Sequence, residues 1–508
     1  MLTTITSMGV QGVDGYIIKV EADTSPGLPN FDVVGLPGTA VRESRDRVRS
    51  SIKNCGFKYP VSRITVNLAP ADVKKEGTIY DLPLFLAILN ASGQTDIDYS
   101  DIAVVGELSL AGEVRPVRGI LSMVIAARDA GIKNVLIPKG NSAEGAVVDG
   151  INVYGVSDVT EVVEHLTGVS RVAKTEYNVD FCGTKTSNFF DFADVRGQGS
   201  ARRALEVAAA GSHNILLIGP PGSGKSMLAK RLPGILPTMT SEEALEATKV
   251  HSVVNLLSGG GLLPNRPFRS PHHGVSAAGL VGGGAPPAPG EVSLAHQGVL
   301  FLDELPEFGR AAMEALRQPL EDGKVTISRA NQTLTFPCQV MLVAAMNPCA
   351  CGFFGHPTKQ CTCTPAQQKK YLSKISGPLL DRIDVHVEVP PVEFDVLAES
   401  TPSENSKMMR ERVMTARKRQ IDRFAGTDIT CNAHMPPAIM REACKMTKAA
   451  ENMLKNVFDK LGLSARAYDR LQKVALTIAD LDGAEGIDVQ HIAEAVQYRT
   501  LDRKYWQQ

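Results

Sequence analysis

Apolar and polar positions alternate along the first 167 residues in two distinct ways, which predict both strands and helices. Residues 15–22 have the composition and pattern of a strand, whereas residues 39–54 place apolar side chains at helical spacing. The same reasoning predicts a strand at 31–36, a strand at 63–68, a buried helix at 82–89, a hairpin at 104–114, a helix at 120–130 and a strand at 134–138. Residues 1–167 are therefore expected to form a compact α/β domain.

The pattern changes twice after this region. Residues 168–188 are polar and irregular, which indicates a linker. Residues 189–392 contain short apolar runs that predict buried strands of a second α/β domain. These runs lie at 215–218, 299–302 and 340–346. Residues 393–508 are expected to form a third, helical domain, interrupted by a polar stretch with prolines at 428–437.

The first apolar run is followed by GPPGSGKS, which has the strand, loop and helix context of a phosphate-binding P-loop. Its residues are Gly219, Pro220, Pro221, Gly222, Ser223, Gly224, Lys225 and Ser226. The glycines let successive backbone N–H groups turn towards a phosphate chain. Lys225 supplies a mobile charge for the β- and γ-phosphates of ATP, and the Ser226 hydroxyl can coordinate Mg²⁺. The alternative is a chance Gly-rich turn at the start of a helix.

Polar side chains also end the other two runs. The run at 299–302 leads into Asp303 and Glu304, the Walker B pattern. There Asp303 would hold Mg²⁺ through water and Glu304 would orient the attacking water. The run at 340–346 ends at Asn347, which resembles the sensor 1 residue that contacts the γ-phosphate or that water. The alternatives are an ordinary strand end and an asparagine in a turn before proline.

Two further stretches flank the Walker B pattern. Residues 266–298 are too rich in Gly and Pro for a helix and predict a projecting loop or hairpin. Residues 322–337 alternate around a polar tip and predict a second hairpin, in which Lys324 and Arg329 are placed to contact a phosphate backbone. The alternative is a surface hairpin with solvated charges. The stretch 266–298 carries positive or titratable residues, namely Arg266, Arg269, His272 and His273. The two histidines could equally be buried polar groups.

Composition limits the function classes. The chain has 54 Lys and Arg against 55 Asp and Glu, so any nucleic-acid surface has to be local. One local candidate is the stretch 407–423, with seven basic and two acidic residues; a solvated helix is the alternative. The N-terminal segment lacks the pattern of a signal peptide and no apolar run is long enough for a bilayer, so we expect a cytoplasmic protein with no membrane partner.

Nine cysteines without an export signal favour metal binding or free thiols over disulfides. Four of them form two Cys-x-Cys pairs directly after Asn347: Cys349, Cys351, Cys361 and Cys363. Four thiolates can close a tetrahedral structural Zn²⁺ site. The alternatives are free cysteines, a redox pair, an iron–sulfur centre, and His356 as a substitute ligand.

Two stretches of the first domain resemble the proteolytic domain of Lon-type proteases, at 75–82 and 105–141. That family needs a serine activated by a lysine. The serine position holds Ile79 or Tyr80, the lysine position holds Leu121, and Ser122 beside it has no matching base. The domain is therefore expected to be Lon-like but not proteolytic, and to serve as an assembly or ligand-contacting platform.

The second and third domains resemble AAA+ ATPases of the branch that contains magnesium chelatases and minichromosome-maintenance helicases. Residues 377–384 match the segment that carries the arginine finger there. The resemblance implies that Arg382 reaches the γ-phosphate of a neighbouring subunit, and hence a ring; the alternative is a salt bridge to Asp381 or Asp384. Arg466 occupies the position of sensor 2, with a solvated surface arginine as the alternative.

The whole chain resembles the YifB/ComM family of magnesium-chelatase-like proteins, through the phrases RPFRSPHH, GEVSLAHQGVLFLDELPEF and GPLLDRIDVHVEVP. The resemblance implies a Lon-protease-like α/β domain, an AAA+ P-loop α/β core with two pore inserts and an all-helical C-terminal lid. It further implies ATP and Mg²⁺ as cofactors, a homo-oligomeric, hexameric ring, and a DNA helicase that drives branch migration during recombination of transforming DNA. The alternative is a chelatase-like ATPase that remodels a protein or metal-cofactor partner.

Overall fold

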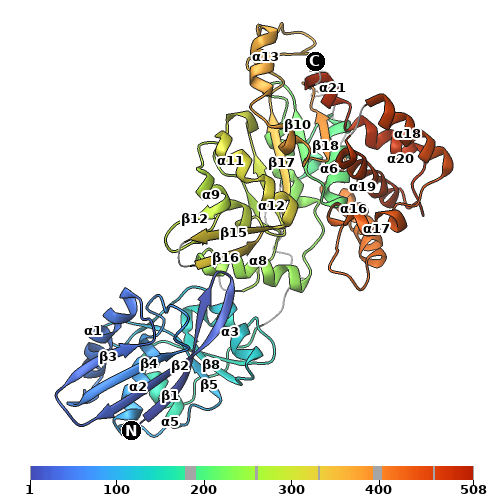
Figure 1. Cartoon of the computed structure of the whole chain (residues 1–508). Helices are drawn as coiled ribbons and strands as arrows, with labels where there is room; N and C mark the ends of the chain where they lie inside the picture. Colours follow the sequence, from blue (N-terminus) through green and yellow to red (C-terminus); the bar gives the residue numbers. More distant parts are fainter. Residues whose placement is uncertain are drawn as a thin grey trace. The chain divides into compact units, whose positions relative to one another are not determined.

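The computed structural model describes residues 2–177, 190–257, 261–329, 332–392, 403–461 and 464–506. The predicted linker at 168–188 lies partly outside these ranges. The chain divides into two compact units, one of residues 1–183 with 245–264 and the other of residues 184–244 with 265–508 (Figure 1). Among the described residues, no helix is both long and apolar enough to span a membrane.

The first unit is built on a seven-stranded sheet. The strands, in spatial order, are β3 (Asn30–Val34), β4 (Arg63–Ala69), β2 (Asp14–Ser25), β1 (Leu2–Gln11), β5 (Ile102–Val104), β8 (Asn134–Pro138) and β9 (Asn152–Val156). Helices α1 (Thr39–Asn54) and α2 (Asp81–Ala91) share one apolar core with this sheet, and α3 (Ile120–Asp129) belongs to a second core. A short hairpin joins β6 (Glu107–Leu108) to β7 (Val114–Arg115). The predicted strands and helices of this region are confirmed.

The positions that correspond to a protease dyad are closed in this unit. Tyr80 directly precedes α2 and is fully buried, and Leu121 on α3 is buried as well. The hydroxyl of Ser122 is buried and donates a hydrogen bond of 2.6 Å to the carbonyl of Val13. An engaged hydroxyl without a general base is not an activated nucleophile.

A five-stranded parallel sheet forms the centre of the second unit. Its spatial order is β11 (Phe268–Arg269), β14 (Val299–Leu302), β17 (Met341–Met346), β10 (Ile215–Ile218) and β18 (Val385–Glu388). Every residue of β10, β14 and β17 is buried, which explains why these strands are continuous apolar runs rather than alternating ones. Because the strands are parallel, the polar residues that follow them meet at one edge of the sheet.

The C-terminal fifth of the chain is helical, as predicted. Its helices are α16 (Ser406–Arg423), α17 (Pro437–Ala443), α18 (Lys448–Leu461), α19 (Ala465–Leu481), α20 (Val489–Gln497) and α21 (Leu501–Tyr505). Helices α16 to α20 share one apolar core with the parallel sheet and with α6 (Gly199–Gly211). The hydrophobic effect therefore fixes this helical region to the sheet.

Part of the basic stretch on α16 is engaged within the unit. Arg417 is buried and donates to the carbonyls of Ala209 and Ala210, which end α6. Arg412 pairs with Glu206 and Glu404, and Arg423 pairs with Asp480. These three arginines attach α16 to the rest of the unit, whereas Lys407 and Lys418 of the same stretch are exposed.

The insert at 266–298 contains more regular structure than its composition predicted. It supplies the edge strand β11 and two short helices, α9 (Ala277–Val281) and α10 (Glu291–Leu294), so the expectation that it is not helical was wrong. The expected hairpin is present as β12 (Gly282–Gly283) paired with β13 (Ala288–Pro289). The hairpin predicted at 322–337 is confirmed as β15 (Lys324–Arg329) paired with β16 (Gln332–Pro337). The polar tip of this hairpin at 330–331 lies outside the described residues.

Candidate functional site

The GPPGSGKS loop leaves the buried end of β10 and leads into α7 (Lys225–Arg231). Gly222 and Gly224 have positive φ angles of 79° and 93°, a region that side chains with a Cβ rarely adopt. The Lys225 side chain turns back under the loop. Its Nζ lies 2.7 Å from the carbonyl oxygen of Gly219, 2.9 Å from that of Pro220 and 3.2 Å from Oδ1 of Asn347.

Burial lowers the pKa of Lys225 to about 8, although the carboxylates of Asp303 and Glu304 oppose this shift. An ammonium group that is removed from water and held only by neutral oxygens gains strongly from an approaching anion. Ser223 lies in the same loop, and its Oγ is buried without a hydrogen-bond partner among the described residues. Both observations fit a phosphate chain at this loop.

Ser226 and Asp303 meet beside Lys225. The Ser226 hydroxyl donates a 2.6 Å hydrogen bond to Oδ2 of Asp303, which follows β14 directly. One hydroxyl and one carboxylate form the small oxygen donor set that suits Mg²⁺, which keeps several of its waters. The pair therefore fits a Mg²⁺ ion shared with a nucleotide.

Glu304 adopts the left-handed conformation, with φ of 53° and ψ of 48°, and its side chain is 59% exposed. A non-glycine residue in this region is uncommon and is frequent at functional sites. The Nδ1 of His273 lies 3.7 Å from Oε2 of Glu304, and the His273 ring packs against His272 at 4.0 Å between ring centroids. His273 thus belongs to the candidate site.

Asn347 follows β17, which lies between β14 and β10 in the sheet. This central position brings its side chain within reach of Lys225. Gln198 approaches the loop from another side: its Nε2 donates to the carbonyls of Pro390 at 2.6 Å and Ser223 at 3.3 Å. The candidate site therefore combines the ends of three parallel strands with the segment that precedes α6.

Arg382 and Arg466 both pair with the same carboxylate, that of Glu321 on α12 (Arg317–Asp322). The Arg382 guanidinium is largely buried, pairs with Glu321 and donates a 2.7 Å hydrogen bond to the carbonyl of Pro378. Arg466 is 64% exposed, with Nη2 3.7 Å from Oε1 of Glu321. Arg382 does form a salt bridge within the chain, but its partner is neither Asp381 nor Asp384.

The four cysteines form one cluster. Their Sγ atoms all lie within 4.8 Å of one another, with separations of 3.4 Å for Cys349 and Cys351, 3.7 Å for Cys349 and Cys361, and 3.6 Å for Cys351 and Cys361. A disulfide needs about 2.05 Å, whereas sulfurs at about 2.3 Å from a tetrahedral Zn²⁺ are about 3.8 Å apart. The backbone N–H of Cys351 also donates to the sulfur of Cys363. The cluster could therefore hold zinc.

His356 takes no part in this cluster. Its Nδ1 accepts hydrogen bonds from the backbone N–H groups of Thr358 at 3.1 Å and Lys359 at 3.0 Å. The sulfur atoms alone supply the four candidate ligands within the described part of the chain.

Comparison with known proteins agrees with this arrangement. Three family models match the chain: "Subunit ChlI of Mg-chelatase" over residues 20–141, "Magnesium chelatase, subunit ChlI" over 191–397 and "Magnesium chelatase, subunit ChlI C-terminal" over 403–499. The chain is 44% identical over 505 residues to the protein YifB of Escherichia coli, covering 99% of this chain and 98% of that one. It is 43% identical over 509 residues to the competence protein ComM of Haemophilus influenzae, with the same coverage. The chain belongs to the YifB/ComM family of magnesium-chelatase-like ATPases.

The first unit of this YifB/ComM member also has a more distant relative. It is 27% identical over 165 residues to a Lon protease of Lachnoclostridium phytofermentans, which covers 30% of this chain and 20% of the protease. The Lon-like resemblance of the first unit is thus supported, while the residues at the dyad positions differ.

Several residues of the YifB/ComM site were not assigned from sequence. Neither the pairing of His273 with Glu304 nor the role of Glu321 was predicted. The pair His272 and His273 in a Gly- and Pro-rich insert could have indicated a functional role. The sequence could not show that His273 contacts Glu304, which belongs to another segment. The guanidinium groups of Arg266 and Arg269, in contrast, are bound by Glu243 and Glu291, which removes them as free phosphate contacts.

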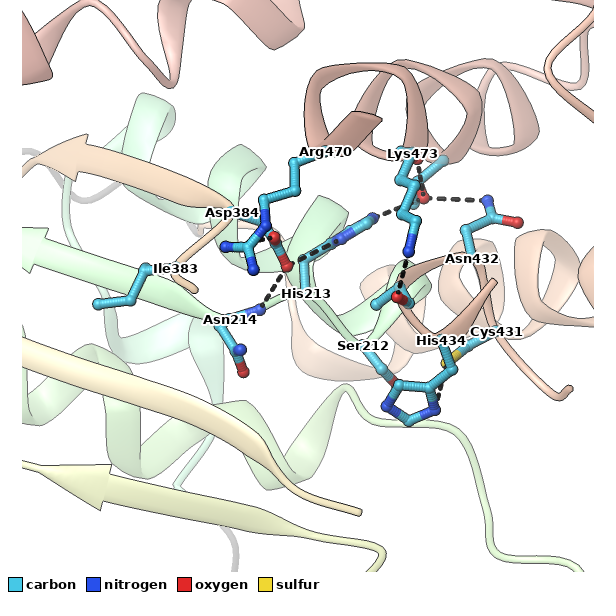
Figure 2. Close-up of polar contacts among 12 residues, drawn as sticks. Ser212, His213, Asn214, Ile383, Asp384, Cys431, Asn432, His434, Arg470 and Lys473 are labelled. Carbon is cyan, nitrogen blue, oxygen red and sulfur yellow. Dashed lines mark hydrogen bonds and ion pairs between the residues drawn. The ribbon is translucent and has the colours of Figure 1, made fainter. Parts of the chain in front are cut away.

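A buried ionic cluster lies next to Arg382. Asp384 Oδ2 accepts from the backbone N–H of Asn214 at 3.2 Å and lies 3.4 Å from Nδ1 of His213, while Arg470 approaches Oδ1 at 3.5 Å (Figure 2). Burial alone would raise the pKa of Asp384, but the hydrogen bond to His213 and the charge of Arg470 hold it well below its usual range. The cluster joins β18 to α19 inside the second unit.

Proposed function

We propose that this YifB/ComM protein is a ring-forming, ATP-hydrolysing DNA motor that acts in DNA recombination or in the uptake of transforming DNA. The observation that carries the proposal is the convergence of Lys225, Ser226, Asp303, Glu304 and Asn347 at one edge of the parallel sheet. The named competence relative supports the DNA part of the proposal because it matches over the whole chain.

Each residue has a distinct role in the proposed reaction. The loop 219–224 and Lys225 hold the phosphates, and Ser226 and Asp303 hold Mg²⁺, which supplies charge neutralisation at the β- and γ-phosphates when bound. Glu304 orients and polarises the attacking water. Asn347 contacts the γ-phosphate, and its present contact with Lys225 supports that placement.

Arg382 and Arg466 act on the nucleotide of a neighbouring subunit. In the described residues their side-chain contacts are with Glu321 and Pro378, and none is with the P-loop. Two arginines that share one carboxylate are in position to act together on an incoming γ-phosphate, where a permanently charged donor stabilises the transition state. A homo-oligomeric ring, most simply a hexamer, follows from this role.

The hairpin β15–β16 is the proposed DNA contact in the pore. Its buried face carries Val325, Ile327, Leu334 and Phe336, which anchor it to the unit. Its other face is exposed and polar, with Lys324 at the base, Thr326 opposite Thr335, and Ser328 opposite Thr333. Hydroxyls and one lysine suit a backbone contact without base specificity.

ATP hydrolysis by the full chain is expected to rise several-fold when branched or single-stranded DNA is added. The measurement is the steady-state rate of phosphate release with and without each DNA, together with DNA binding at low salt, where phosphate contacts are strongest. No stimulation and no binding would exclude the DNA motor. Stimulation by a protein or tetrapyrrole partner instead would favour a chelatase-like remodeller, which the magnesium-chelatase family models support.

The four-cysteine cluster is proposed to hold one structural Zn²⁺. Purified wild-type protein is expected to contain about one zinc per chain, and Cys361→Ser is expected to lose it because three thiolates leave the tetrahedron open. Elemental analysis of the metal measures this. Cys55→Ser is the matched control, since Cys55 is partly exposed in the other unit and lies outside the cluster. Wild-type protein without metal, or with iron in place of zinc, would contradict the proposal.

A further inference from the structure

The segment that contains the four cysteines has an unusual charge pattern. Residues 348–376, which we term the knuckle segment, contain four lysines and no Asp or Glu, in a chain whose acidic and basic residues are nearly equal in number. The segment connects Asn347 to the helix before Arg382 and includes α13 (Pro365–Leu372). In Figure 1, α13 projects beyond the end of the parallel sheet.

Three of these lysines are available to a ligand. Lys359, Lys369 and Lys370 are exposed, and in the described ranges none of them is within ion-pair distance of a carboxylate. The Lys359 ammonium lies over the ring of Phe353 at 5.1 Å from its centroid. The fourth, Lys374, is engaged by Glu307 at 3.0 Å. The exposed surface of the segment is therefore positive without internal compensation.

The cysteine cluster holds these lysines on one rigid element. Lys359 lies two residues before Cys361, and Lys369 follows Gln368 on α13. The Gln368 side chain donates to the sulfur of Cys361 at 3.5 Å and to the carbonyl of Cys363 at 3.4 Å. A fixed arrangement of charges loses less entropy on binding than lysines on a mobile loop.

The knuckle segment also touches three parts of the candidate ATP site. A Cβ added to Gly352 would lie 2.5 Å from Cδ of Pro221 in the P-loop, so the backbone of Gly352 packs closely on the Pro221 ring. Tyr371 on α13 is buried, and its hydroxyl interacts with the backbone of Asn347. Lys374 binds Glu307 in the turn after Asp303 and Glu304. A ligand on this segment would act on residues that contact the phosphates.

We propose that the knuckle segment is a second nucleic-acid contact, which binds the phosphate backbone of single-stranded DNA through Lys359, Lys369 and Lys370. Binding there stimulates ATP hydrolysis through the contacts with the P-loop, Asn347 and Glu307. A polyanion is the partner of matching chemistry because the segment offers lysines and no acidic group that would repel it. The partly buried Phe353 and Phe354 add aromatic surface for unstacked bases. This inference rests on the proposed DNA motor.

The test replaces the three lysines together, as Lys359→Gln, Lys369→Gln and Lys370→Gln in the full chain. The probe is a fluorescently labelled single-stranded oligonucleotide, with binding measured by anisotropy across a salt series. Loss of three phosphate contacts is expected to lower the slope of log K against log salt by about 2, since each contact on a single strand contributes about 0.7. The DNA-stimulated ATPase rate is expected to fall towards the basal rate, which stays unchanged.

The matched control is the triple variant Lys448→Gln, Lys455→Gln and Lys460→Gln, three exposed lysines on α18, a helix that also carries acidic residues. This control is expected to keep the wild-type slope and stimulation.

If wild type binds DNA and the knuckle variant binds with the same slope, the inference is wrong and the motor proposal stands. If wild type does not bind DNA, both are wrong. If the knuckle variant keeps its salt slope but loses assembly in size-exclusion chromatography, the segment is a subunit interface and the inference is overturned.

Discussion

Mixing two inactive variants, Glu304→Gln and Arg382→Ala, is expected to restore ATP hydrolysis. Each variant alone should lose about 10³-fold in rate, because Glu304 is proposed to orient the attacking water and Arg382 to stabilise the transferred charge. In a mixed ring, an Arg382→Ala subunit still supplies Glu304 and a Glu304→Gln neighbour still supplies Arg382. With random assembly and independent sites, about a quarter of the interfaces combine both intact residues, so about a quarter of the wild-type rate is expected.

The control mixture combines Glu304→Gln with Lys225→Ala. Glu304 and Lys225 both belong to the candidate site of a single subunit. No interface of the mixed ring therefore regains a complete site, and the mixture should stay inactive. Steady-state phosphate release from mixtures assembled with ATP measures both cases. An inactive first mixture, from variants that still assemble, would show that Arg382 acts within its own chain or only through its salt bridge to Glu321.

The substitution Asp384→Asn is expected to destabilise the second unit by about 3 kcal/mol, because it leaves Arg470 partly buried without its carboxylate. Urea unfolding measures the change. Trp506 is the only tryptophan of the chain, and its ring lies 6.1 Å from that of His386 on β18, so its fluorescence reports on this unit. Asp381→Asn is the matched control, since Asp381 is the neighbouring acid and no described cation pairs with it at salt-bridge distance; a change below about 0.5 kcal/mol is expected.

The loss of stability caused by Asp384→Asn should become smaller at acidic pH. The folded-state pKa of Asp384 is depressed, so its stabilising contribution is complete above the unfolded-state pKa of about 3.9 and declines as the pH falls from there towards the folded-state pKa. The stability difference between wild type and Asp384→Asn should therefore be constant near neutral pH and shrink below about pH 4. A difference that stays constant down to pH 3 would mean that packing, and not charge, holds the cluster together.

Local motifs allowed the strands and the P-loop to be predicted. A P-loop motif such as 219–226 can be recognised locally, because a cradle of consecutive backbone N–H groups needs only a short stretch of sequence and two flanking elements. The parallel strands were equally visible, since burial on both faces leaves only apolar residues. The insert at 266–298 was predicted less well, because tertiary pairing of β11 with β14 overrode its Gly- and Pro-rich composition.

Pairings over long distances in the chain could not be predicted. Glu321 lies 61 residues before Arg382, and Asp381 and Asp384 were the acids that sequence proximity suggested. Charge alone also could not show that Arg266, Arg269 and Arg417 are each bound by a group from another segment. Sequence gives the number and sign of charges, while the fold decides which of them remain free.

The amino-acid sequence by itself determined the α/β and helical character of the chain, the phosphate-binding loop, the acidic strand end and the presence of four cysteines in one short segment. These features depend on spacing along the backbone, which local geometry fixes. Only the tertiary structure brought Asn347 to Lys225, His273 to Glu304, and Arg382 with Arg466 to Glu321. Those contacts join different elements, and the packing of the parallel sheet and its helices around one apolar core decides where such elements meet.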